Sequence, residues 1–108
     1  MMILRDYLVS DLSAADVALA PGPLILNFGT NWCGHCQAAH TPIIEALAVH
    51  PQVRHVSIED GKGRPLGRAF KVTLWPTLVF LHDGREVARV VRPTEAAPVS
   101  AALQQIVS

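Results

Sequence analysis

The chain has 108 residues, half of them apolar and 17% charged, which predicts a single folded domain over residues 1–108. Nine basic and nine acidic side chains cancel to a formal charge of zero, so the broad positive surface needed for nucleic-acid or membrane-surface binding is excluded. Only two cysteines are present, Cys33 and Cys36, which excludes a scaffold held by several disulfides. The pair is therefore interpreted as a redox couple or as part of a metal site.

The amino-terminal residues do not have the pattern of a targeting signal. Arg5 and Asp6 follow a short apolar run, whereas a secretory signal needs about 7 to 15 uninterrupted apolar residues. No run approaches the roughly 20 apolar residues of a membrane span. We therefore expect a soluble, monomeric protein of the reducing cytoplasm, with neither nucleic acid nor membrane as a partner.

Hydrophobic patterning predicts helices and strands that alternate along the chain. The predicted elements are a short helix at 11–20, a buried strand at 24–29, a long helix at 33–49, a strand at 53–58, a short helix at 66–70, strands at 77–81 and 86–91 joined by a turn at 82–84, and a helix at 96–106. Strands separated by helices, with one antiparallel pair near the end, imply an α/β fold in which a mixed sheet lies between helices.

The chemistry-bearing segment is Trp32-Cys33-Gly34-His35-Cys36, between the predicted central strand and the first turn of the long helix. Backbone N–H groups and the helix dipole favour an anion there, so Cys33, at the exposed N-terminal end, is expected to have a depressed pKa and to act as the nucleophile. Cys36 lies one turn further in and is placed to close a disulfide with Cys33.

This segment, together with Pro42, Trp75-Pro76-Thr77 and the hairpin at Gly84, resembles the thioredoxin superfamily over nearly the whole chain. The resemblance implies a thioredoxin fold with a four- or five-stranded mixed sheet flanked by helices on both faces. It also implies that Pro76 is cis and lies against the cysteine pair, and that the backbone of Trp75 is free to pair with an extended substrate segment.

Two departures from the thioredoxin pattern bear on the tuning of the site. The dipeptide Gly34-His35 resembles that of the protein disulfide isomerases. A His35 that stabilises the Cys33 thiolate makes the couple more oxidising than thioredoxin, in the range of roughly −180 to −250 mV. Asn27 stands where thioredoxins place a buried Asp, so a carboxylate proton acceptor for Cys36 is missing and its attack is expected to be slower.

Two further departures alter the expected substrate-binding face. Arg92 stands where thioredoxins usually have a small Gly, and Trp75 is bulkier than the usual residue before the cis-proline. With Trp32 and Pro76, they are predicted to border the cysteine pair and to contact the substrate.

The resulting hypothesis is an enzyme, a thioredoxin-like disulfide oxidoreductase that uses no cofactor or metal besides the Cys33–Cys36 pair. Its expected partners are protein or small-molecule disulfides as substrates, with thioredoxin reductase or glutathione as the electron donor. One alternative is a metal-binding or metal-delivery module that uses both cysteines and His40, with His35 nearby. Another is a non-redox peptide-binding module or chaperone in which the cysteines are incidental.

Overall fold

The structure is a computed structural model that describes residues 7–107. In this part of the chain the elements are, in order, α1 (Ala14–Ala18), β1 (Pro23–Gly29), α2 (Gly34–Leu47), β2 (Arg54–Glu59), α3 (Pro65–Ala69), β3 (Thr77–His82), β4 (Arg85–Val91) and α4 (Ala96–Val107). None of these helices is long and apolar enough to cross a membrane.

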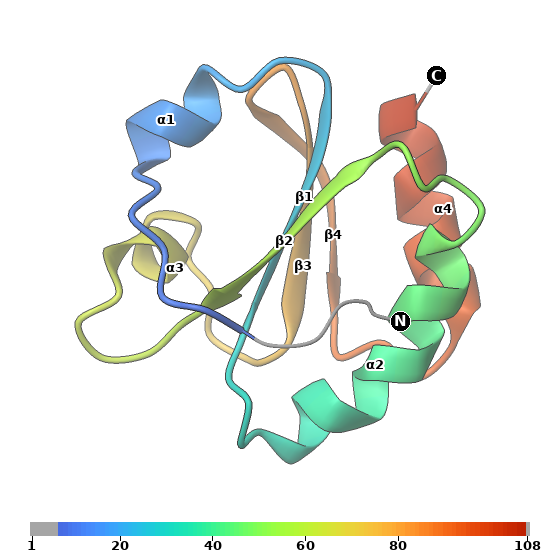
Figure 1. Ribbon diagram of the computed structural model, residues 1–108, viewed down its shortest axis with the longest axis horizontal. Helices are drawn as coiled ribbons and strands as arrows, with labels where there is room; N and C mark the ends of the chain where they lie inside the picture. Colours follow the sequence, from blue (N-terminus) through green and yellow to red (C-terminus); the bar gives the residue numbers. More distant parts are fainter. Residues whose placement is uncertain (1–6, 108) are drawn as a thin grey trace.

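The four strands form one mixed sheet in the order β2-β1-β3-β4. β1 pairs with β2 in parallel and with β3 antiparallel, and β3 pairs antiparallel with β4. Figure 1 shows α1 and α3 on one side of this sheet and α2 and α4 on the other. The predicted fold class, a helix-flanked mixed sheet with a terminal antiparallel pair, is confirmed.

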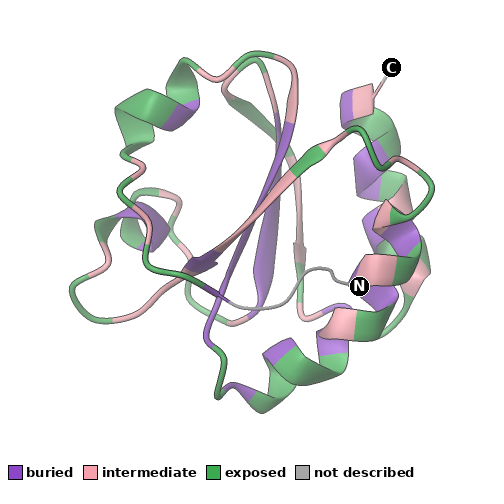
Figure 2. Cartoon of the chain, in the orientation of Figure 1, coloured by how far each residue is buried: buried purple, intermediate pink, exposed green. Residues whose placement is uncertain are grey.

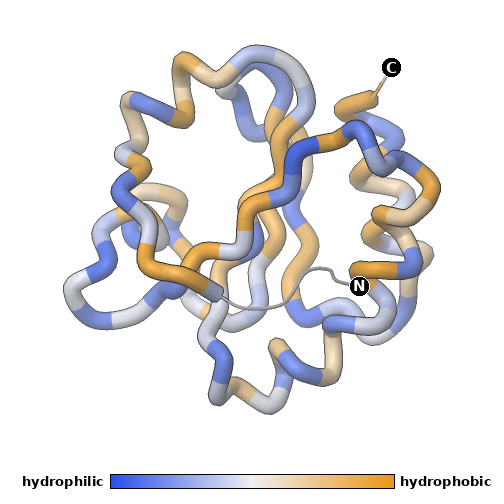
Figure 3. Tube along the Cα trace, viewed as in Figure 1, coloured by the Kyte–Doolittle hydropathy of each residue, from blue (hydrophilic) through white to orange (hydrophobic). Residues whose placement is uncertain are grey.

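Both faces of β1 are buried, as its near-continuous apolar sequence predicts. Ile25 packs with α2 and α4, whereas Leu24, Leu26 and Phe28 pack on the opposite face with residues of α1 and α3. In Figure 2 the centre of the sheet is purple, that is buried, along β1 and β3. Figure 3 shows most residues of the same strands in orange, that is hydrophobic. β1 is therefore packed on both faces up to its last residue, and the segment that follows it starts from a fixed position.

The first helix is shorter than the predicted range of 11–20. Ser13 caps its N-terminus: the Ser13 side chain accepts a hydrogen bond from the Asp16 N–H at 3.1 Å, and Asp16 Oδ2 accepts one from the Ser13 N–H at 3.0 Å. The cap fixes the start of α1 at Ala14, after residues that sequence periodicity alone assigns to the helix. The predicted helix bounds were wrong at both ends.

The turn between β3 and β4 is tighter than predicted, because His82 still belongs to β3. Asp83 and Gly84 form the two-residue connection, with φ angles of 51° and 80°. The last helix begins at Ala96 as predicted, and Pro98 lies in its first turn, where its missing N–H has no intrahelical partner to lose.

A segment before α1 adds to the free edge of β2. Leu8 forms an isolated parallel bridge with Ile58; its N–H donates to the Ser57 carbonyl at 3.3 Å, and its carbonyl accepts from the Glu59 N–H at 2.8 Å. These bonds bring Tyr7 to the end of the sheet at which β1 terminates. No pattern in the sequence predicts this contact.

Candidate active site

Cys33 and Cys36 lie where β1 has ended and α2 begins, as predicted. Cys33 is the N-cap of α2, and its Sγ accepts a hydrogen bond from the Cys36 N–H at 3.3 Å. Both cysteines are free thiols and both are buried, with exposed fractions of 8% for Cys33 and 4% for Cys36. The expectation that Cys33 is exposed was therefore wrong: neighbouring side chains of the active site cover it.

The Trp75–Pro76 peptide bond is cis, as the resemblance implies. It places the Trp75 carbonyl oxygen 4.0 Å from Cys33 Sγ, although 42 positions separate the two residues. The same carbonyl accepts a hydrogen bond from Arg92 Nε at 2.8 Å, so it is not free for a partner strand as the sequence analysis expected. A substrate segment that pairs here has to share this oxygen with Arg92 or to displace it.

Arg92 follows β4 and adopts a φ of 50°, the left-handed region that favours glycine. A glycine would adopt this backbone conformation without the strain that the Arg92 side chain introduces. Here the N–H of Arg92 donates to the Pro76 carbonyl at 2.9 Å, while its side chain reaches Trp75. Among residues 7–107 no carboxylate lies within ion-pair distance of Arg92, which leaves a positive charge beside the cysteine pair.

The two tryptophans border the site together. Their ring centroids lie 5.6 Å apart in an edge-on arrangement, and Trp32 is 74% exposed. The Trp75 indole N–H donates to Asp60 Oδ2 at 2.8 Å, which fixes that ring against the loop after β2. Both tryptophans border the cysteine pair as predicted, whereas no sequence signal pointed to Asp60.

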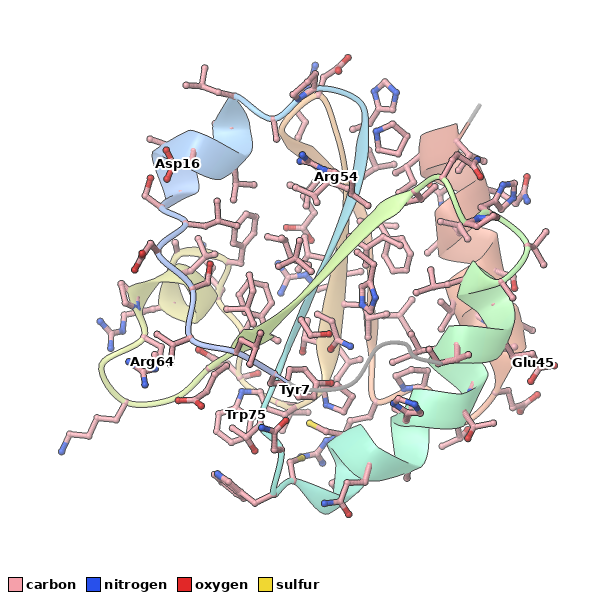
Figure 4. All side chains as sticks on the ribbon, in the orientation of Figure 1. Tyr7, Asp16, Glu45, Arg54, Arg64 and Trp75 are labelled. Carbon is pink, nitrogen blue, oxygen red and sulfur yellow. The ribbon has the colours of Figure 1, made fainter. Side chains whose placement is uncertain are left out.

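Tyr7 and Asn27 lie beneath the cysteines. The Tyr7 hydroxyl donates to Asn27 Oδ1 at 2.9 Å, and Asn27 is 1% exposed. Tyr7 belongs to the same buried cluster as Cys33 and Cys36, and Figure 4 shows it with Trp75 near the sulfur atoms. Asn27 is among the site residues predicted from the sequence, and Tyr7 is not. The available signal was Gly29, because a glycine in a buried strand often marks a close approach by another group.

Burial raises the pKa of the Cys36 thiol to about 11, and its hydrogen bond with Cys33 acts in the same direction. The Tyr7 hydroxyl has the opposite effect on the pKa of Cys36, but burial outweighs it. Burial also raises the pKa of Tyr7 far above its ordinary value. At neutral pH Cys36 is therefore a thiol and Tyr7 keeps its proton.

Gly34 and His35 occupy the first turn of α2 and are exposed, so neither is held by the protein core. His40 lies further along the same helix. Within residues 7–107, no three His, Cys, Asp or Glu side chains are grouped so that they could hold a metal ion. The structure therefore adds no support to the metal-binding alternative.

Comparison with known proteins places this geometry in a family. The profile of the Thioredoxin family matches residues 9–105. Thioredoxin from Chlamydia trachomatis is 38% identical over 85 residues, covering 77% of this chain and 80% of that protein. Thioredoxin from Chlamydia pneumoniae is 39% identical over 80 residues, covering 70% and 74%. The reduced structure of thioredoxin 2 from Pseudomonas aeruginosa is 47% identical, covers 95% of both chains and superposes with a TM-score of 0.85.

A family match over nearly the whole chain, together with a cysteine pair at the start of α2 and a cis-proline opposite it, leads to one conclusion. The chain belongs to the thioredoxin family of thiol–disulfide oxidoreductases.

Proposed function

We propose that this protein reduces disulfides of protein substrates, with Cys33 as the nucleophile and Cys36 as the resolving thiol. One observation carries the assignment: Cys33 Sγ caps α2 and accepts its amide hydrogen bond, while Cys36 lies deeper with a pKa of about 11. Cys36 is uncharged at neutral pH and so is not the sulfur that attacks first.

The reaction proceeds in two exchanges. The Cys33 thiolate attacks one sulfur of the substrate disulfide, a mixed disulfide forms, and the other substrate sulfur leaves as a thiolate that takes a proton from solvent. Cys36 then loses its proton to solvent and attacks Cys33 Sγ. The Cys33–Cys36 bond forms, and the second substrate sulfur is released and protonated. Two electrons pass from the dithiol to the substrate.

The surroundings of the pair suggest how substrates dock and how the couple is tuned. Trp32, Trp75, Pro76 and Arg92 border Cys33 and are proposed as the substrate-binding surface. His35 and Gly34, between the cysteines, are proposed to make the couple more oxidising than in thioredoxins with Gly-Pro at these positions. No cofactor beyond the cysteine pair is required, and a reducing cytoplasm is the proposed compartment.

Coupled turnover tests the proposed partners. The oxidised protein is incubated with NADPH and thioredoxin reductase, or in parallel with glutathione, and insulin disulfide reduction is followed. We expect continuous turnover with the reductase, because the family is generally reduced by that enzyme. Turnover with glutathione alone would change the assigned electron donor. Failure with both donors, and with a chemically reduced protein in stoichiometric amount, would contradict the proposed function.

A further inference from the structure

Tyr7 is fixed by hydrogen bonds of both its backbone and its hydroxyl, in addition to the packing of its ring. The Asn31 side-chain amide contacts its backbone on both sides: Asn31 Oδ1 accepts from the Tyr7 N–H at 2.8 Å, and Asn31 Nδ2 donates to the Tyr7 carbonyl at 3.4 Å. The next residue, Leu8, is bonded to β2. The hydroxyl donates to Asn27 Oδ1. Backbone and hydroxyl are therefore both fixed.

Gly29 brings Tyr7 into contact distance of the resolving thiol. A Cβ atom at Gly29 would lie 2.6 Å from Cys36 Sγ and 2.8 Å from Cζ of Tyr7, the carbon that bears the hydroxyl. A side chain at position 29 would thus displace both groups. Because Gly29 has none, the Tyr7 ring and Cys36 Sγ both lie next to the position that a Cβ would fill, within one buried cluster.

This space is unfavourable for charge, yet Cys36 has to become a thiolate in order to attack Cys33. Asn27 cannot accept the proton as a carboxylate would. The titratable groups that act on Cys36 are Cys33 and Tyr7. His55 lies on the same face of the sheet, but it pairs with Ile25, two positions before Asn27 along β1. The backbone of Thr30 and the Tyr7 hydroxyl both lower the pKa of Cys36 by hydrogen bonding, and of these two groups the Tyr7 hydroxyl is the side chain that can turn toward the developing charge.

We propose that Tyr7 is a catalytic residue of the resolving step, whose hydroxyl donates to Asn27 Oδ1 in the resting dithiol and to Cys36 Sγ as that sulfur becomes a thiolate. This inference rests on the proposed function, because it concerns the second exchange. Tyr7 does not give up its proton, since burial raises its pKa far above neutrality. It redirects a hydrogen bond, and Asn27 holds the hydroxyl until it is needed. The proton of Cys36 passes to solvent.

A symmetric aromatic disulfide whose thiolate is coloured separates the two exchanges. The first equivalent of coloured thiolate released reports the attack of Cys33. The second equivalent, released in the same mixing experiment, reports resolution by Cys36. In Tyr7→Phe, which keeps the ring, we expect the first phase to be unchanged. The second should slow about tenfold or more at neutral pH, the range expected for loss of a hydrogen bond to a charged group.

Ser57→Ala is the matched control. It also removes a buried hydroxyl close to Asn27 in the sheet, but Ser57 Oγ has no hydrogen-bond partner among the described residues. Both phases should be unchanged. Equal slowing of both phases in Tyr7→Phe, no slowing in either, or the same slowing in Ser57→Ala would overturn the proposal. If the unmodified protein releases fewer than two equivalents, the proposed function itself fails and this inference fails with it.

A second measurement does not depend on exchange. In a Cys33→Ser background, the ultraviolet absorbance of the thiolate reports the ionisation of Cys36 alone. Adding Tyr7→Phe should move that ionisation to higher pH, because the bond that stabilises the thiolate is lost. An unchanged midpoint in a variant that still unfolds cooperatively would contradict the proposed contact.

Discussion

Cys33→Ser is expected to abolish disulfide reduction, whereas Cys36→Ser should still attack substrates and become trapped with them. Serine keeps the size of each side chain, so both variants should fold. Without Cys33 the nucleophile at the N-cap of α2 is missing, and Cys36, buried with a pKa of about 11, cannot replace it near pH 7. Insulin reduction and non-reducing electrophoresis of the reaction mixtures measure the two outcomes.

The comparison of the two variants is informative because their structural perturbations are matched. Mixed disulfides should accumulate in Cys36→Ser and be absent from Cys33→Ser. Retention of most activity by Cys33→Ser, or equal trapping by both variants, would show that the assigned order of attack is wrong. If the double variant retained the activity of the unmodified protein, the non-redox binding module would be the correct interpretation.

The free energy of unfolding is expected to fall by about 3 kcal/mol as the pH decreases from about 6.5 to about 4, through His55. Burial lowers the pKa of His55 to about 4, and its Nε2 atom is buried without a partner. In this pH range the unfolded chain binds a proton on His55 that the folded chain does not. The stabilisation from a neutral His55 is therefore present above about pH 6.5 and is lost as the pH falls.

His55→Leu should remove this part of the pH dependence, because leucine has similar bulk and no titratable group. Urea unfolding at about pH 7 and about pH 4.5 measures the difference for the variant and for the unmodified protein. His40→Gln, which removes a histidine of α2 and leaves His55 in place, is the matched control and should keep the part of the pH dependence assigned to His55. An equally steep pH dependence in His55→Leu would assign the effect to other groups.

The sequence contained enough information to place the cysteine pair. A continuous apolar run predicts β1, a helical period predicts α2, and the boundary between them puts Cys33 at a helix N-terminus. These are local signals, carried by neighbouring residues. The predicted bounds differ from the observed ones by one to several residues for α1 and at the β3–β4 turn. A side-chain cap sets the start of α1, and residues with positive φ angles form the turn.

The long-range contacts that complete the site could not be predicted from patterns of neighbouring residues. Tyr7 reaches Asn27 across 20 positions and Asn31 across 24, from a segment without a regular pattern. The sequence alone marks Arg92 as an unusual residue at its position, but its bond to the Trp75 carbonyl depends on the path of the chain after β4. Sequence spacing identifies which residues carry the chemistry, whereas long-range packing decides which groups touch them.

A redox titration of the whole protein tests the central claim most directly. The protein is equilibrated in glutathione buffers of graded potential, its free thiols are blocked by alkylation, and the two states are quantified by mass spectrometry. We predict a single two-electron transition that joins Cys33 to Cys36, at roughly −180 to −250 mV. Thiols that stay free across the whole range, or a product with glutathione on one cysteine and no Cys33–Cys36 bond, would contradict a redox-active pair.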